Sequence, residues 1–202
     1  MRRAGHYWTL QDWVHVFKKA HTQGGHLLPL SSLCRVSGLS EPAARKALKR
    51  LERRGMISRV GPSLYSSSIF PAVLEEIAMQ VGKPCYISFE SVLARHGILS
   101  QSPLVLTCAT PRKPRRLKTL SGEIVFRHLA HKLFWGFREE KGVLWAEPEK
   151  ALLDWMYWNS QVSGEMPALD ELSLEELDRK KLDLWRQRYP RTVQNKITKS
   201  II

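Results

Sequence analysis

The chain has 202 residues and a mass of 23.3 kDa, which allows one domain or two small ones. Hydrophobic residues make up 43% and charged residues 25%, a globular balance that excludes a wholly disordered or fibrous chain. The 32 Lys and Arg residues exceed the 19 Asp and Glu residues by +13, which predicts a polyanionic partner, either nucleic acid or an anionic membrane surface.

The positive charge is concentrated near the N-terminus. Residues 1–66 contain 12 Lys and Arg residues against three acidic residues, whereas residues 67–202 contain 20 against 16. The first third of the chain therefore carries +9 of the net charge of +13. A serine run at 66–68, followed by a proline, is typical of a domain boundary. We predict a basic domain over residues 1–68 and a second domain over residues 69–202.

The first helix is expected to begin at Thr9, because residues 9–12 resemble a capping box. Apolar side chains then recur at helical spacing, and the helix is expected to end before Gly24. The stripe that we expect to be buried consists of Leu10, Trp13, Val14 and Phe17.

A short second helix is expected over residues 31–37, with Leu33 and Val36 as its core contacts. Gly38 supplies a tight turn after it. A short helix and a glycine turn before a longer helix form the layout of a helix-turn-helix motif.

The third helix is the strongest local pattern in the sequence. Ser40 favours an N-cap, Pro42 falls in the first turn, and Gly55 is typical of the residue that follows a helix. At about 100° per residue, the basic side chains of residues 41–54 lie opposite an apolar seam. The seam consists of Ala44, Ala47, Leu48 and Leu51.

Residues 56–66 predict a two-stranded hairpin with a turn at 61–63, as in the wing of a winged helix. We expect Ile57 and Val60 near the core and Arg59 near the tip. Such a helix fits the major groove of double-stranded DNA, whereas the narrow groove of RNA excludes it. The expected groove contacts are Arg45, Lys46 and Lys49, the expected phosphate contacts are Arg50, Arg53 and Arg59, and Ser40 suits either a phosphate or a capping bond.

The second domain alternates short helices and strands, which predicts an α+β fold with a small, mainly antiparallel sheet after the N-terminal winged helix-turn-helix. Ser88 is expected to cap a helix that ends near Gly97. The C-terminal tail, residues 170–202, is expected to be helical in two pieces that are broken at Pro190. The other expected helices are 73–81 and 149–158, and the expected strands are 83–87, 104–109, 117–120, 124–126, 133–137 and 143–146.

A basic run follows the strand at 104–109. It suits a second contact with nucleic acid, but also a solvated loop or edge strand, where cations and proline prevent unwanted strand pairing. The run consists of Arg112, Lys113, Arg115, Arg116 and Lys118.

The sequence contains no phosphate-binding glycine loop, no catalytic triad and no cysteine or histidine spacing typical of a metal site. We therefore expect no enzymatic activity, no metal and no cofactor. For Lys150 and Asp154 the spacing predicts a helical ion pair, and for residues 147–154 as a whole it predicts capping and core packing. Three isolated cysteines and the absence of a long apolar run favour a cytoplasmic protein without a membrane partner.

Five stretches in order resemble the AbiEi antitoxins, the antitoxin and repressor half of bacterial AbiE-type (type IV) toxin–antitoxin systems. The resemblance implies a winged helix that binds inverted repeats at its own promoter and a second domain that helps to neutralise a nucleotidyltransferase toxin without a stable complex. The stretches are residues 53–65, 86–93, 120–129, 133–137 and 147–154.

Three other functions remain as alternatives. The chain could be an interaction module that binds a toxin directly, an orphan winged-helix regulator without a toxin, or a metal-dependent nuclease that uses Glu149. The first differs from a repressor in forming a stable complex, the second in having no toxin gene beside it, and the third in metal-stimulated cleavage.

Overall fold

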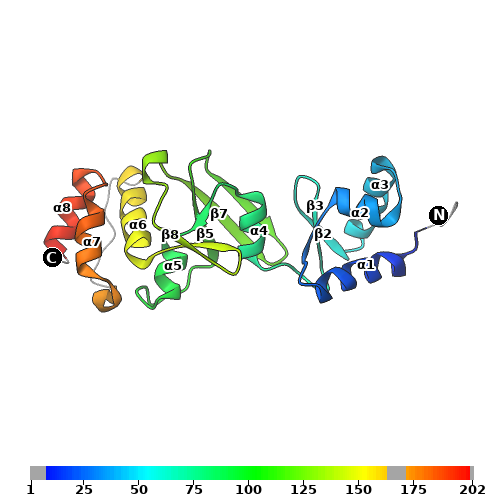
Figure 1. Cartoon of the computed structure of the whole chain (residues 1–202), viewed down its shortest axis with the longest axis horizontal. Helices are drawn as coiled ribbons and strands as arrows, with labels where there is room; N and C mark the ends of the chain where they lie inside the picture. The colour runs from blue at the N-terminus through cyan, green and yellow to red at the C-terminus, as the bar shows by residue number, and fades with distance from the viewer. Residues whose placement is uncertain (1–7, 163–171, 201–202) are drawn as a thin grey trace. The chain divides into compact units, whose positions relative to one another are not determined.

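The computed structural model describes residues 8–162 and 172–200 (Figure 1). It is a mixed α+β structure, as predicted. The chain divides into two compact units. The first runs to Val73 and includes Thr119–Ser121, and the second contains Leu74–Lys118 and the chain from Gly122 onward. In the first unit, the Ser121 hydroxyl donates a hydrogen bond to the Ala72 carbonyl oxygen at 2.7 Å.

Three helices and a small antiparallel sheet form the first unit. The strand order is β1-β3-β2, and buried side chains from the helices and from β2 and β3 form one core. The elements are α1 (Leu10–Thr22), β1 (Leu27–Pro29), α2 (Leu30–Ser37), α3 (Glu41–Arg53), β2 (Ile57–Gly61) and β3 (Leu64–Ser67).

Helix α1 begins with the predicted capping box. The Thr9 backbone N–H donates to Asp12 Oδ2 at 2.8 Å, and the Asp12 N–H donates to Thr9 Oγ1 at 3.3 Å. Trp13 and Phe17 are buried as predicted. The prediction for Leu10 is wrong: its side chain is 38% exposed, because it stands at the first position of the helix, a turn before the residues that reach the core.

Helix α2 begins one residue earlier than predicted, at Leu30. Leu30 and Leu33 are buried, and Gly38 takes the left-handed conformation that the predicted turn requires. The prediction for Val36 is wrong, since it is 59% exposed. The earlier start places Leu30 on the buried line of the helix, and this line continues through Cys34 and not through Val36.

The end of α3 is a Schellman motif. Gly55 has φ of 68°, its N–H donates to the Glu52 carbonyl, and the N–H of Met56 donates back to the Leu51 carbonyl. The predicted seam of the helix is confirmed in full, with exposures between 0% and 6%.

The predicted hairpin is present as β2 and β3. Ile57 and Val60 are both buried although they are three positions apart, which in a regular strand would place them on opposite faces. The register explains this, because Arg59 pairs with Tyr65 and Gly61 pairs with Leu64, so Val60 lies in a bulge. The bulge turns Val60 inward and leaves Arg59 exposed, as expected.

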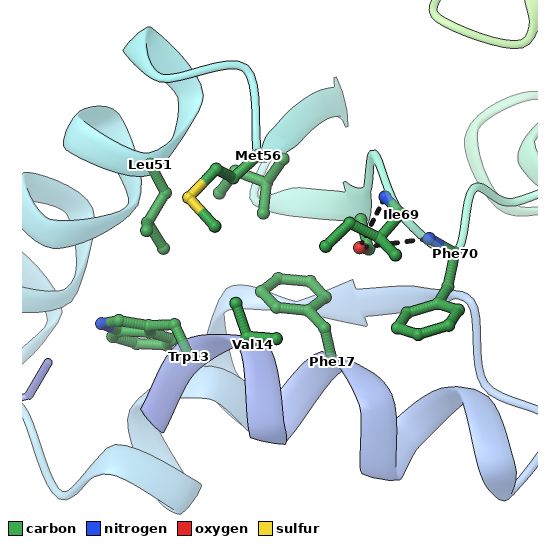
Figure 2. Close-up of a pocket in the computed structure, with 9 residues that line it drawn as sticks. Trp13, Val14, Phe17, Leu51, Met56, Ile69 and Phe70 are labelled. Atoms are coloured by element: carbon green, nitrogen blue, oxygen red, sulfur yellow. Dashed lines mark hydrogen bonds between the residues drawn. The ribbon is translucent and has the colours of Figure 1, made fainter. Parts of the chain in front are cut away.

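Figure 2 shows a small hollow in this core, between α1 and the segments that carry Leu51, Met56 and Ile69. The Ser67 hydroxyl at its edge accepts hydrogen bonds from the N–H groups of Ile69 (3.1 Å) and Phe70 (3.3 Å). The cavity volume is about 10 Å³, room for one water molecule, so the hollow is a packing defect of the core. Its lining consists of Trp13, Val14, Phe17, Leu51, Met56, Ile57, Ser67, Ile69 and Phe70.

The second unit is built on a six-stranded sheet in the order β6-β7-β5-β4-β9-β8. Its strands are β4 (Tyr86–Ile87), β5 (Val105–Thr110), β6 (Arg115–Thr119), β7 (Gly122–His128), β8 (Phe137–Glu140) and β9 (Val143–Ala146). Its helices are α4 (Leu74–Val81), α5 (Glu90–Arg95), α6 (Pro148–Val162), α7 (Arg179–Arg186) and α8 (Arg191–Ser200), with short 3-10 turns at His131–Leu133 and Leu174–Glu176.

The sheet is mixed. Strands β4 and β5 pair antiparallel, as do β8 and β9, but β5 pairs parallel with β7 and β4 pairs parallel with β9. The prediction was a mainly antiparallel sheet, and these two parallel pairs depart from it. They join strands that are distant in sequence, for which no turn signal exists.

Two strand predictions and one cap are wrong. Residues 131–133 form a 3-10 turn and Gly136 has φ of 75°, so the strand predicted over 133–137 begins only at Phe137. Of the strand predicted over 83–87, only Tyr86–Ile87 forms a strand, β4. The strand predicted over 104–109 is present as β5, but it starts one residue later and leaves Leu104 fully exposed. The N-cap of α5 is Phe89 (φ 60°) and not Ser88, because the Ser88 hydroxyl donates instead to Asp154.

The C-terminal tail is helical in two pieces, as predicted. Helix α7 ends at Arg186 and α8 begins at Arg191, directly after Pro190. The predicted ends of this tail, at residues 170–171 and 201–202, lie outside the described residues.

Candidate nucleic-acid interface

Helix α3 separates its residues by chemistry. The apolar seam faces the core, and the opposite side carries the cations, which are all exposed. Within the described residues, Lys46, Lys49 and Arg53 make no ion pair, and the acids on the helix are Glu41 and Glu52. These cations can therefore bind a polyanion without first breaking an ion pair within the protein.

Arg45 differs from its neighbours because it is already engaged. Its Nε donates to Glu41 Oε1 at 2.9 Å, and its Nη2 donates to Ser63 Oγ at 3.0 Å. The hydrogen bond to the Glu41 carboxylate raises the pKa of the Arg45 guanidinium above its ordinary value. The structure thus places this predicted groove contact between α3 and the turn of the β2–β3 hairpin.

The other predicted contacts lie around this helix. Arg50 and Arg53 are exposed in its last turn, and Arg59 is exposed on β2, where its Nε donates to the Gly61 carbonyl at 3.2 Å. Ser40 is the N-cap residue, but its side chain makes no capping hydrogen bond. The capping explanation for Ser40 is therefore removed, and its exposed hydroxyl suits the alternative, a phosphate.

The basic run of the second unit forms β6, at the edge of the sheet, and the loop before it. Arg115 donates to the Val81 carbonyl and lies over the Phe126 ring at 4.8 Å, and Arg116 pairs with Glu123 at 3.0 Å. The remaining cations of the run, Arg112, Lys113 and Lys118, are exposed and have no ion pair among the described residues. The cations on β6 prevent this edge strand from pairing with another chain. The three exposed cations without an ion pair are available for a contact with nucleic acid.

The second unit contains a buried polar cluster that the sequence pattern did not predict. The predicted ion pair of Lys150 and Asp154 is confirmed, but both side chains are fully buried. Asp154 also accepts hydrogen bonds from the hydroxyls of Tyr86 (2.8 Å), Ser88 (2.8 Å) and Tyr189 (2.7 Å). One feature of the sequence indicated this burial: three apolar residues, Ala-Leu-Leu, lie between Lys150 and Asp154. Because they cover most of the helix circumference, α6 has buried residues on every side.

The titration of this cluster follows its burial. Loss of solvation raises the pKa of Tyr86 and of Tyr189 well above the ordinary value, and the Asp154 charge adds to the effect. Burial lowers the pKa of Lys150, and the neighbouring Asp154 opposes that change. The hydrogen bonds of the cluster join β4, α6 and the segment after α7. Each of its side chains is at most 3% exposed, so no reactant reaches it.

Glu149, the residue of the nuclease alternative, is also buried. Its Oε1 accepts a hydrogen bond from the Asp178 backbone N–H at 3.0 Å, and its Oε2 lies 3.3 Å from Lys181 Nζ. The Glu149 carboxylate therefore anchors the start of α7. Across the described part of the chain, no three His, Cys, Asp or Glu side chains come close enough to bind a metal ion.

None of the helices within residues 8–162 and 172–200 combines the length and the hydropathy that a membrane span requires. Comparison of the chain with models of known protein families gives no match, and comparison with curated proteins gives none either. The function is therefore inferred from the site itself and from the resemblance to the AbiEi antitoxins.

Proposed function

We propose that the first unit is a winged helix that binds double-stranded DNA, with α3 in the major groove. The observation that carries the proposal is the division of α3 into a buried seam and an exposed cationic side. On that side Lys46, Lys49 and Arg53 make no ion pair with any residue that the structure describes. The short helix α2, the Gly38 turn and the β2–β3 hairpin support it, because they surround α3 in the order of that motif.

We propose further that the chain is a repressor of its own promoter and the antitoxin of an AbiE-like pair. This part rests on the resemblance to the AbiEi antitoxins. The toxin would be a nucleotidyltransferase that the second unit helps to neutralise without a stable complex, and the protein would act in the cytoplasm without a membrane partner. Repression requires specific DNA recognition, which groove contacts supply in addition to phosphate contacts.

The test measures binding to a duplex from the DNA upstream of the reading frame, across a series of salt concentrations. The variant Lys46→Gln/Lys49→Gln should weaken binding and reduce the slope of log K against log salt, because it removes two proposed groove contacts together with two cations that would lie among the phosphates. The matched control is Lys18→Gln/Lys19→Gln, which removes two exposed cations of α1. Equal losses for both variants would contradict the assignment to α3.

A second experiment tests the antitoxin role. If a nucleotidyltransferase-like gene lies beside this one, its expression should stop growth, and expression of the full chain should restore it. A stable stoichiometric complex without promoter binding would favour the direct interaction module, and the lack of such a gene would favour an orphan regulator. Cleavage of DNA that depends on Mg²⁺ and is lost in Glu149→Gln would favour the nuclease.

A further inference from the structure

Arg45 and Ser63 form a link between α3 and the β2–β3 turn. The Arg45 guanidinium uses two of its three nitrogens in it: Nε and Nη2 both contact Glu41 Oε1, at 2.9 and 2.8 Å, and Nη2 also reaches Ser63 Oγ at 3.0 Å. The side chain crosses 18 residues of sequence to make the last contact. An arginine that served only to contact a DNA base would not require a hydrogen bond to the hairpin turn.

Ser63 is held on its other side as well. Its carbonyl oxygen accepts a hydrogen bond from the Leu30 N–H, the first residue of α2, at 2.8 Å. Its φ of 56° lies in the left-handed region, which residues other than glycine rarely adopt. The turn is therefore fixed in an uncommon conformation by one contact to α2 and one to α3.

The charge distribution separates Arg45 from the other cations of α3. Glu41 neutralises Arg45, so a phosphate placed beside this pair releases little counterion. Lys46 and Lys49 have no ion pair within the described residues, and each would replace a condensed counterion. The exposed cations Lys46, Lys49 and Arg53 therefore attract DNA more strongly than the neutralised Arg45 does.

We infer that Arg45 is a positioning residue, which holds the hairpin turn at a fixed place beside α3 so that the helix and the turn meet DNA as one rigid surface. The inference rests on the proposed DNA binding, whose groove contacts it reassigns: Lys46 and Lys49 contact the DNA, and Arg45 sets the geometry. Ser63 is its partner in that role.

The experiment measures affinity and salt slope on the upstream duplex and on an unrelated duplex, together with the melting temperature. Ser63→Ala changes no charge, and Ser63→Gly removes the same hydroxyl while it relieves the left-handed strain. Each should weaken binding to the upstream duplex about fivefold, the loss of one charge-assisted hydrogen bond, with the slope unchanged. Arg45→Gln should weaken binding to a similar extent, and Arg45→Gln/Ser63→Ala should lose no more than either single variant.

The control for the electrostatic contribution is a lysine variant. Lys46→Gln should reduce the slope on both duplexes. If Arg45→Gln reduces the slope equally while both Ser63 variants bind normally, Arg45 contacts phosphate and the inference is overturned. The inference is also overturned if Ser63→Ala loses affinity only together with a lower melting temperature while Ser63→Gly binds normally. The contact would then serve folding alone. If the unaltered chain binds neither duplex, both the DNA-binding function and this inference are overturned.

Discussion

Gly136 occupies a position where the backbone and a neighbouring side chain both require glycine. Its φ is 75°, and an added Cβ would lie 3.0 Å from Cδ and 3.1 Å from Cγ of the fully buried Lys150. We predict that Gly136→Ala lowers the free energy of unfolding by about 3 kcal/mol, from backbone strain and overpacking together. Gly142→Ala is the control, because its φ is 80° but nothing lies within 4 Å of the new Cβ. Urea unfolding should give a clearly smaller loss for the control, and equal losses would contradict the packing argument.

Asp154 is the acceptor at the centre of the buried cluster. Its replacement by Asn would leave the Lys150 ammonium buried without a counter-charge. We predict that Asp154→Asn lowers the free energy of unfolding by about 3–5 kcal/mol, measured by urea titration. The control is Glu140→Gln, which breaks the exposed ion pair to Arg95 and should cost at most about 1 kcal/mol. A small loss in Asp154→Asn would mean that Lys150 is neutral in the folded protein.

At the scale of elements, α7 and α8 belong to the core of the second unit through the fully buried Leu182, Val193 and Ile197, and polar contacts anchor them as well. Tyr189, between the two helices, donates to Asp154, and Glu149 accepts from the N–H of Asp178 before α7. We predict that Tyr189→Phe accelerates amide hydrogen exchange in residues 179–198, because it frees one anchor of this hairpin. Exchange in β5 and β7 should stay unchanged. Faster exchange throughout the unit would show that Tyr189 supports the whole core.

Local elements were the part of the fold that the sequence could predict. The α1 capping box, the α3 seam and the Pro190 break each depend on residues within one or two turns of each other. The Val60 bulge and the parallel pairing of β5 with β7 depend on distant partners, which no local pattern describes. At the candidate site, the exposure of the α3 cations followed from helical periodicity. The Arg45–Ser63 contact did not, because it requires the position of the hairpin turn relative to the helix.

At the scale of the whole molecule, each unit has its own core. Leu48 is fully buried in the first unit, and Leu152 is fully buried in the second. We predict that Leu48→Ala, at a cost of about 2–5 kcal/mol, accelerates hydrogen exchange in residues 10–67 and leaves β5 and β7 protected. Leu152→Ala should produce the reverse pattern. A uniform change in both variants would mean that the two units unfold as one.

Stability at alkaline pH is set by the buried groups of the second unit. Burial raises the pKa of Cys85 from 9.0 to about 12, and the pKa values of Cys108, Tyr86 and Tyr189 are also raised. Above pH 9 the unfolded chain releases these protons while the folded chain keeps them, so stability falls as pH rises. The lowered pKa of Lys150 acts in the opposite direction, because the folded chain gives up that proton first.

We therefore predict a melting temperature that decreases from pH 9 to pH 11, with a shallower decrease in Cys85→Ala. Between pH 6 and pH 8, below the ordinary pKa values of cysteine and tyrosine, the variant and the unaltered protein should show parallel curves. A decrease of unchanged steepness in Cys85→Ala would show that the thiol ionises without unfolding.

The hydrogen bond from Ser121 to Ala72 has a consequence for biosynthesis. During translation the ribosome releases the segment up to Val73 well before it releases Thr119–Ser121, so the N-terminal unit is incomplete when its own sequence first emerges. The nascent chain gains this last contact only after about fifty further residues have been added. A truncation after Val73 would yield a fragment without that contact, and probes of DNA binding are best made on the uncut polypeptide.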